Sequence, residues 1–151
     1  MNITLKTFDE LSNAELYELL KLRSEIFVVE QNCVYLDLDD FDQEALHLFI
    51  KENTHIIAYV RLLQPGSRFK EASIGRVVTK SAFRNKGVSR SLMLAAIEHI
   101  EKKWELPVIK LSAQSYLCSF YESLGFKIVT EEYLEDGIPH FGMKRIVQHA
   151  R

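Results

Sequence analysis

The most informative stretch of the chain is V-V-T-K-S-A-F-R-N-K-G-V-S-R, from Val77 to Arg90. A β-rich run ends there, a short loop follows, and a basic turn opens a long helix. The free backbone amides of such a turn point at one place, where the helix dipole also favours negative charge. Gly87 lets an anion approach the backbone closely, and Ser89 is small enough to permit it. The turn therefore predicts a phosphate or pyrophosphate site, and the alternative is a basic helix start on a solvated face.

The segments around this turn predict a strand–helix–strand unit. Ser73–Thr79 has the composition of a strand, and apolar residues recur with a helical period from Gly87 to Trp104. Pro107 then restarts the chain into a second strand over Val108–Ala113. A crossover of this kind makes its two strands parallel neighbours, with a right-handed connection.

The N-terminal half begins with a helix signal between strand-like runs. Ser12 and Glu15 have the S-x-x-E spacing of a capping box, in which each side chain bonds the backbone amide of the other residue. The helix that follows carries an apolar stripe that Arg23 interrupts. Strand-like runs lie at Ile3–Thr7, Ala45–Lys51 and His55–Leu63, and the last two are joined by a predicted hairpin turn.

The C-terminal part predicts a short helix and two more strands. Leu117–Leu124 is helical in pattern, and Gly125 ends it. Strands are predicted at Phe126–Tyr133 and Phe141–Ile146, joined by a turn that contains the strong Asp-Gly signal. The fold class is therefore α/β (α+β), with a central mixed sheet of about seven strands and helices on both faces.

Composition narrows the class of protein. The 151 residues include 19 Lys and Arg against 21 Asp and Glu, a net charge of −2, which argues against a nucleic-acid partner. The two cysteines are too few for a disulfide framework, and no cluster of His, Cys and Asp has the spacing of a metal site. The sequence shows neither a signal peptide nor a membrane span. We expect one domain over residues 1–151, in the cytoplasm, with no metal and no membrane partner.

Four motifs resemble one known family. R-N-K-G-V-S, from Arg84 to Ser89, is similar to the acetyl-CoA loop [RQ]-x-x-G-x-[GA] of the GNAT (GCN5-related) N-acetyltransferases, with Ser89 standing in for the last small residue. Y-E-S-L-G-F, which begins at Tyr121, resembles the Y-E-x-x-G-F signature of the same family. F-V-V-E-Q-N-C from Phe27 and E-D-G-I-P-H from Glu135 are similar to the ElaA-like branch. The resemblance covers nearly the whole chain.

The resemblance implies a GNAT-type fold whose parallel strand pair splays to admit acetyl-CoA as co-substrate. It implies that Tyr121 protonates the CoA thiolate, and that Val78 or its neighbours polarise the thioester oxygen. Many members carry a glutamate base on the fourth strand, where this chain has Gly75. The residues that the resemblance assigns to acetyl-CoA are Val77, Val78 and Thr79 for the pantetheine arm, Arg84, Asn85, Lys86, Gly87, Val88 and Ser89 for the pyrophosphate, and Gln114.

The remaining candidates each have a structural alternative. Glu30 or His140 is the tentative general base, but for Glu30 the residues favour a buried ion-pair network with Arg61 or Arg76. His47 is a weaker candidate for the base. Cys33 is expected to be a buried packing residue rather than a reactive thiol. The acidic run from Asp37 to Glu44 is either a solvated loop or an acceptor entrance that attracts a cationic amine.

The expected function is transfer of an acetyl group from acetyl-CoA to a primary amine by direct attack. The alternative is a non-catalytic module that binds or senses acyl-CoA, and a third reading is a nucleotide or phosphate-ester binder. The acceptor stays open between a small amine, a polyamine, a peptide and a lysine. The sequence is also compatible with a homodimer.

Overall fold

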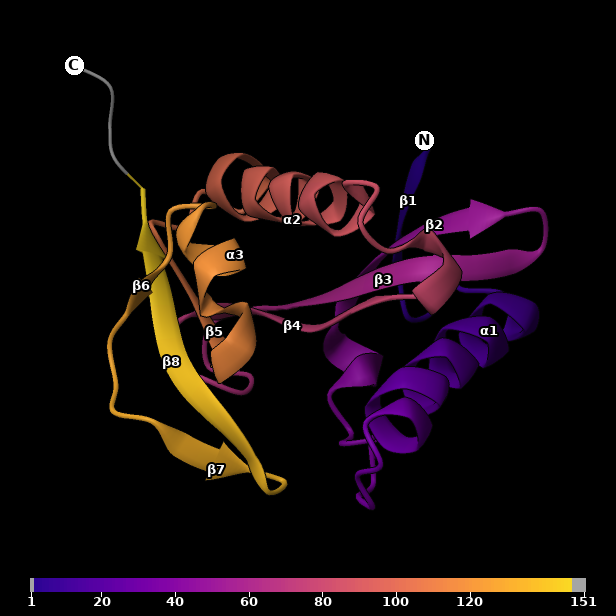
Figure 1. The fold of residues 1–151 in the computed structure, drawn as a ribbon. Coiled ribbons are helices and arrows are strands. Elements are labelled where there is room, and N and C mark those ends of the chain that lie inside the picture. Colours follow the sequence, from indigo (N-terminus) through magenta and orange to yellow (C-terminus); the bar gives the residue numbers. More distant parts are fainter. Residues whose placement is uncertain (1, 148–151) are drawn as a thin grey trace.

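The computed structural model describes residues 2–147, and eight strands of these residues form one mixed sheet (Figure 1). The order across the sheet is β1-β2-β3-β4-β5-β8-β6, and β7 pairs with β8. The β4–β5 pair is parallel, as the predicted crossover requires, and the other pairs are antiparallel. The strands are β1 (Ile3–Thr7), β2 (Leu46–Glu52), β3 (His55–Leu63), β4 (Ala72–Thr79), β5 (Val108–Gln114), β6 (Lys127–Ile128), β7 (Tyr133–Glu135) and β8 (Ile138–Ile146).

Three α-helices flank the sheet, and two of them continue as π-helices. The predicted capping box at Ser12 is present, because the Glu15 amide bonds Ser12 Oγ at 3.1 Å and Glu15 Oε1 accepts from the Ser12 amide at 2.9 Å. The helices are α1 (Asn13–Arg23) with the π-helix η1 (Ser24–Glu30), α2 (Val88–Glu98) with the π-helix η4 (His99–Lys103), and α3 (Cys118–Glu122) after the 3₁₀ turn η5 (Ser115–Leu117).

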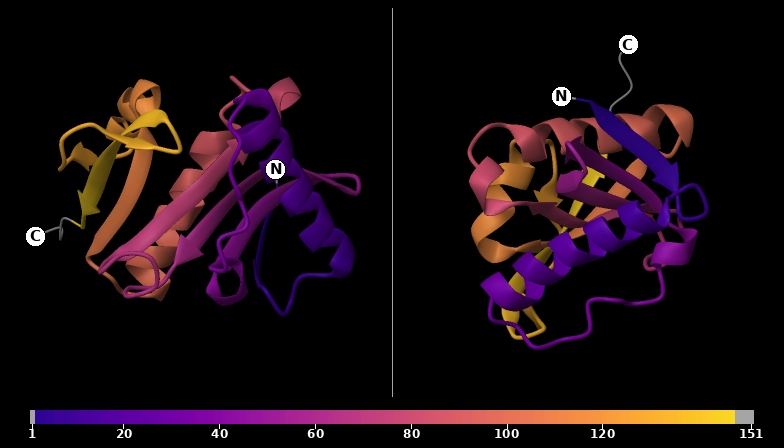
Figure 2. Two further views of the ribbon diagram at one scale, coloured as in Figure 1. Left: turned by 90° about the horizontal axis from the view of Figure 1, so that it is seen from below. Right: turned by 90° about the vertical axis from the view of Figure 1, so that its right-hand side faces the viewer.

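The helices cover both faces of the sheet, as expected. Helices α2 and α3 lie on one face and α1 lies on the other (Figures 1 and 2). Leu92, Met93 and Tyr121 belong to the larger core, between α2, α3 and the sheet. Leu19 and Leu22 of α1 pack with Phe49, Tyr59 and Val78 in a second core on the opposite face.

The parallel strands β4 and β5 touch only at their beginnings. Their register consists of two pairs, Ala72 with Ile109 and Ser73 with Lys110. Beyond these pairs the strands diverge, so the sheet opens into a V (Figure 2). A bulge in β4 accompanies the divergence: the register with β3 shifts between Tyr59 and Arg61, and Arg76 adopts a left-handed backbone with φ 53°. The residues after the bulge therefore leave the β5 side of β4 without a strand partner.

The C-terminal strands differ from the prediction. The expected strand Phe126–Tyr133 consists of two separate short strands, β6 and β7, and β8 begins at Ile138 rather than Phe141. Asp136 and Gly137 both have positive φ, 51° and 78°, which is the backbone of a type I′ hairpin turn. The turn fixes the register of Glu135 opposite Ile138 and lengthens β8. The sheet therefore has eight strands instead of about seven.

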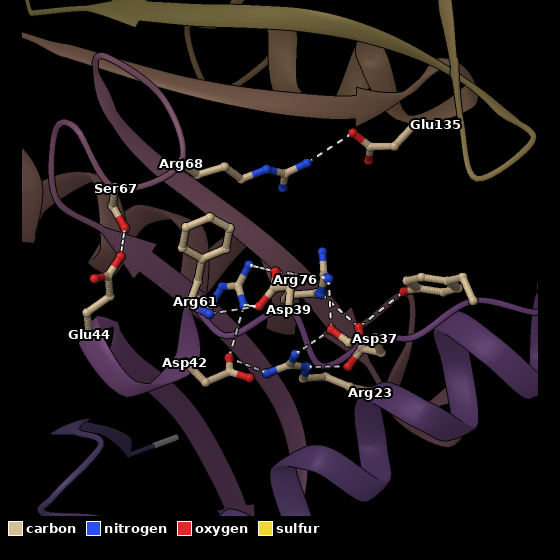
Figure 3. Close-up of polar contacts among 12 residues, drawn as sticks. Arg23, Asp37, Asp39, Asp42, Glu44, Arg61, Ser67, Arg68, Arg76 and Glu135 are labelled. Carbon is tan, nitrogen blue, oxygen red and sulfur yellow. Dashed lines mark hydrogen bonds and ion pairs between the residues drawn. The ribbon is translucent and has the colours of Figure 1, made fainter.

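The acidic run is part of a buried ion-pair network, so the prediction of a solvated loop is wrong for Asp37, Asp39 and Asp42 (Figure 3). Arg23 is 0% exposed and binds both Asp37 and Asp42, which explains why a charged residue interrupts the apolar stripe of α1. Arg61 is 1% exposed and binds Asp39 and Asp42 at 2.7–2.9 Å.

The network attaches the segment after η1 to the bulge of β4. Arg76 donates to the Asp37 carbonyl oxygen at 3.0 Å and to Asp39 Oδ2 at 3.2 Å. Burial alone would raise the pKa of Asp39, but the guanidinium of Arg61, reinforced by Arg76, lowers it to about 2. These carboxylates are neutralised within the fold, so the network offers little free charge to attract a cationic amine.

Removal of one carboxylate from this network should destabilise the protein strongly. Asp42→Asn leaves two buried guanidinium groups short of a counter-charge, and we expect a loss of roughly 3–5 kcal/mol in the free energy of unfolding at pH 7. Burial raises the pKa of Asp42, but the guanidinium groups of Arg23 and Arg61 outweigh burial and lower the pKa below the ordinary 3.8. Ionised Asp42 therefore stabilises the folded state, and this stabilisation is lost as the pH falls through the lowered pKa. The deficit of the variant should therefore shrink as the pH falls below about 4. Urea unfolding at pH 7 and pH 3 tests this, with Asp40→Asn in the same run as the control. A deficit that is equal at both pH values would contradict it.

Candidate active site

The basic turn has the geometry of an anion site. Gly87 is the N-cap of α2 with φ 75°, and no side chain caps this end of the helix. The first helical bond is from the Ser91 amide to the Gly87 carbonyl oxygen at 3.1 Å. The amides of Val88, Ser89 and Arg90 therefore have no intrahelical acceptor, and they present the positive end of the helix dipole.

Side chains fix this turn to the end of β4. Ser89 Oγ lies 2.6 Å from Thr79 Oγ1, so the hydroxyl at the position where the GNAT pattern has Gly or Ala links the helix start to the strand. Arg84 donates from Nε to the Thr79 carbonyl oxygen at 3.1 Å and from Nη2 to Glu30 Oε2 at 2.6 Å. Glu30 therefore pairs with Arg84, and the predicted pairing with Arg61 or Arg76 is wrong.

Two residues of β4 direct their backbone groups into the space where β4 and β5 diverge, which we call the splay. In an antiparallel ladder, residues whose N–H and C=O face the partner strand alternate with residues whose groups face away. The Lys80 amide bonds the Ile57 carbonyl oxygen of β3 at 2.8 Å, so Val78, two residues earlier, also faces β3. By the same alternation Val77 and Thr79 direct their backbone groups into the splay. Of the expected trio, it is therefore the neighbours of Val78 whose amides point away from β3.

A cleft of about 570 Å³ lies along this splay, within the roughly 300–1,000 Å³ typical of ligand pockets. We call it the large cleft. Lys86 does not line it, and its ammonium group lies 5.8 Å from the centre of the Phe83 ring. The predicted site residues that line the large cleft are Val77, Val78, Thr79, Arg84, Asn85, Gly87, Val88, Ser89, Gln114, Tyr121 and Glu30.

A second cavity of about 100 Å³, the small cavity, adjoins the large cleft. Cys33 also lines this cavity and is only half-buried, so the expectation that it is buried is wrong. The Cys33 thiol donates to the Asp136 carbonyl oxygen at 3.2 Å, which connects the segment after η1 to the β7–β8 turn. Both cavities are lined by Phe27, Gln31, Val77, Gln114, Leu117 and Tyr121.

Tyr121 lies where the two cavities meet. Its side chain is 6% exposed, and its ring packs edge-on against Phe120 and Phe126 at centroid distances of 5.2 and 6.2 Å. Burial raises the pKa of the phenol above its ordinary value of 10. The ring is thus held by apolar packing and keeps its proton at neutral pH, while the residue lines both cavities.

The two base candidates lie on different sides of Tyr121. His140 is buried and lines the small cavity, whereas Glu30 is half-exposed, lines only the large cleft and is engaged by Arg84. His47 lines neither cavity, because its ring nitrogens contact Tyr59 Oη at 2.5 Å and the Asp42 carbonyl oxygen at 2.9 Å. Of the two candidates, His140 is therefore the one that lines the small cavity.

Sequence reasoning missed Gln31. Its side chain and that of Gln114 exchange amide hydrogen bonds at 3.2 and 3.5 Å across the junction of the two cavities. The π-helix η1, in which the amides of Gln31 and Cys33 bond residues five positions earlier, brings Phe27 and Gln31 to this junction. A wide helical turn of this kind is common at functional sites, but the apolar period of the sequence does not reveal it.

Comparison with known proteins identifies the class. The splayed sheet with its anion turn has the fold of an acyl-CoA N-acyltransferase from Pseudomonas aeruginosa, whose crystal structure has a TM-score of 0.90 at 43% identity and covers 96% of this chain and 99% of that one. The crystal structure of Escherichia coli ElaA has a TM-score of 0.88 at 39% identity, with the same coverage of both chains.

The chain belongs to the GNAT family of acetyltransferases. Residues 12–147 match the Acetyltransferase (GNAT) domain. In sequence the chain is similar to Protein ElaA of Escherichia coli strain K12, with 43% identity over 143 residues, which is 93% of this chain and 94% of ElaA. The family and branch that the four motifs indicated are confirmed.

Two kinds of feature are absent from residues 2–147. No group of three or more His, Cys, Asp or Glu side chains in this range is placed to hold a metal ion. No helix in the same range has the length and apolarity needed to cross a membrane.

Proposed function

We propose that this protein transfers the acetyl group of acetyl-CoA to a primary amine. One observation carries the proposal: a cleft that ends in an anion site meets a second cavity at Tyr121, Val77 and Gln114. Acetyl-CoA in the large cleft and an amine in the small cavity would bring the thioester and the nitrogen together at this junction. Attack by a bound amine gains from the fixed orientation of the two reactants.

The large cleft has groups that suit each part of acetyl-CoA. The free amides of Val88, Ser89 and Arg90 suit the pyrophosphate, and Arg84 adds positive charge when it exchanges Glu30 for a phosphate oxygen. The backbone groups of Val77 and the backbone amide of Thr79 suit the amides of the pantetheine arm, whereas the Thr79 carbonyl oxygen already accepts from Arg84. Acetyl-CoA supplies an activated acetyl group, and the protein supplies position and charge stabilisation.

Polarisation of the thioester is the task of a backbone amide at the splay. Val77 lines both cavities, and its amide faces away from β3, so it is positioned to donate to the carbonyl oxygen as negative charge develops there. Tyr121 then protonates the departing sulfur. Burial raises the pKa of Tyr121, so the phenol is protonated when the reaction begins and is available to donate as negative charge develops on the sulfur.

His140 is the proposed general base, and Glu30 is assigned to the cofactor side. The imidazole lines the small cavity, where the amine would enter, and it does not line the large cleft. This arrangement separates the two proton transfers: His140 accepts from the nitrogen on one side of the junction, and Tyr121 donates to sulfur on the other.

Turnover distinguishes an enzyme from a module that only binds acyl-CoA. We expect free thiol to appear when the protein is mixed with acetyl-CoA and a panel of alkylamines, arylamines, polyamines and peptides, at a rate that depends on the amine. Acetyl-CoA alone is the control for hydrolysis. Tight binding of CoA in calorimetry, with no thiol release for any amine, would replace this proposal by the binding module.

A further inference from the structure

The small cavity contains a carboxylate to which neither the sequence nor the family assigns a role. Glu135 ends β7, directly before the hairpin turn, and its side chain lines this cavity. Its Oε1 accepts from Arg68 Nη2 at 3.1 Å and from Ser112 Oγ at 3.3 Å. Its other oxygen, Oε2, lies 3.5 Å from His140 Nε2.

The contacts of His140 define which ring nitrogen carries the proton. Nδ1 lies 2.7 Å from the Ile138 carbonyl oxygen, which can only accept, so Nδ1 is the protonated nitrogen of the neutral ring. Nε2 then has a free lone pair, and it faces the Glu135 carboxylate. Nε2 of His140 and Oε2 of Glu135 are both acceptors and lie 3.5 Å apart. The negative carboxylate therefore attracts a proton to Nε2.

We propose that Glu135 is a positioning residue that acts through His140, and that the pair receives the proton of an alkylammonium acceptor. The proposal rests on the proposed acetyl transfer. An alkylamine is an ammonium ion near neutral pH, since its ordinary pKa is about 10, and it must lose a proton before its nitrogen can attack. Nε2 takes this proton, and the Glu135 carboxylate stabilises the imidazolium that results.

The protons balance over one turnover. The ammonium gives one proton to His140 before attack, the C–N bond forms as the C–S bond breaks, and the acylated nitrogen gives up a second proton. Tyr121 protonates the sulfur and is restored by one of these two protons, while the other leaves to water. His140 therefore accepts one proton from each acceptor and returns to the neutral imidazole, beside the ionised Glu135, before the next.

Glu135 is held in place from the opposite half of the sheet. Arg68 lies on the β3–β4 loop and extends toward Glu135 across the space between the two halves (Figure 3). Among residues 2–147, no carboxylate other than Glu135 lies within 4.0 Å of a ring nitrogen of His140. The Tyr133 ring of β7 stacks on the His140 ring, with 6.2 Å between the ring centroids. The other titratable or charged residues that line this cavity are Cys33, Tyr35, Arg68, Arg76, Tyr121 and Asp136.

Glu135→Gln tests the role, with Glu131→Gln as the matched control. Both variants remove one negative charge from the same segment, but Glu131 is exposed and does not line the cavity. NMR of the imidazole signals, with His140 assigned through a His140→Gln variant, gives the pH at which the ring is half-protonated. We expect the ring to be protonated less readily in Glu135→Gln than in the wild type, because the carboxylate that faces Nε2 is gone, and Glu131→Gln to match the wild type.

Kinetics supply the second readout. For the alkylamine that the wild type uses best, kcat/KM should fall about 10- to 100-fold in Glu135→Gln, with its acid limb displaced to lower pH. Turnover of an arylamine, which is already neutral at the same pH, should fall less than threefold. Far-UV circular dichroism and thermal unfolding establish that both variants fold.

The outcomes separate this role from the proposed function. A wild type that uses alkylamines, with both Gln variants alike in NMR and kinetics, overturns the role of Glu135 and leaves acetyl transfer intact. A wild type that acetylates only arylamines also overturns it. If no amine turns over, the proposed function fails and the ammonium role fails with it, while the NMR comparison alone decides whether Glu135 controls protonation of His140.

Discussion

Gly87→Glu is expected to weaken CoA binding by at least about 100-fold, which corresponds to ~2.7 kcal/mol. A Cβ atom at Gly87 meets no other atom within 4 Å, so the new side chain would stand in the open cleft, where the pyrophosphate must approach. Its carboxylate would also face the free amides of α2 and take the place of the anion. Isothermal titration calorimetry with CoA measures the loss.

A matched control separates this effect from backbone strain. Gly66 has φ 83° and Gly87 has φ 75°, and a Cβ atom at either position meets open space. Gly66→Glu therefore introduces the same charge and similar strain in a turn that does not line the cleft. Its dissociation constant for CoA should stay within about twofold of the wild type. If a folded Gly87→Glu protein binds CoA as tightly as Gly66→Glu, the turn is not the pyrophosphate site.

Local sequence signals predicted the scaffold well. The Ser12 capping box, the Asp136-Gly137 turn and the crossover into Val108–Ala113 each depend on residues close together in the chain, and the structure contains all three. The short strands near residue 128 depend instead on how β8 pairs with two partners. A run of β-forming residues does not determine where such a strand is interrupted, because pairing is decided by the neighbouring strands.

The candidate site was predictable on the cofactor side and less so on the acceptor side. The basic turn is one continuous segment, so its residues could be named from the sequence. The small cavity is built from distant segments: Arg68 and Glu135 are 67 residues apart, and Gln31 and Gln114 are 83 apart. Arg23 likewise has partners 14 and 19 residues away. Such contacts leave no local pattern, because they exist only when the sheet has assembled.

The divergence of β4 and β5 connects these two sides. Because the strands separate after Ser73, the β5 side of β4 beyond the bulge faces the large cleft instead of a neighbouring strand. The same separation leaves space for the small cavity, whose walls come from both halves of the sheet. The ion pairs of Arg76 with Asp37 and Asp39 hold the bulge that precedes the splay. The ion-pair network and the candidate site therefore meet at the same irregularity in β4.

Tyr121→Phe should lower kcat about 100-fold and leave CoA affinity and the fold unchanged. The substitution keeps the ring and its edge-on packing against Phe120 and Phe126, and it removes only the proton donor. The loss should shrink when the leaving thiol is more acidic, because a better leaving group needs less help from an acid. Tyr121 should contribute no alkaline limb to the rate near neutral pH, since burial raises its pKa above 10.

Tyr116→Phe is the control for Tyr121→Phe, because it also removes a phenolic hydroxyl beside the large cleft. Tyr116 is 73% exposed and does not line the small cavity, so it is not one of the residues that the two cavities share at their junction. We expect its kcat to stay within about twofold of the wild type. Single-turnover measurements keep product release from hiding the chemical step. A chemical step equally fast in both variants would mean that water or another group protonates the sulfur; Tyr121 would then be a packing residue, and the pyrophosphate site at Gly87 would be unaffected.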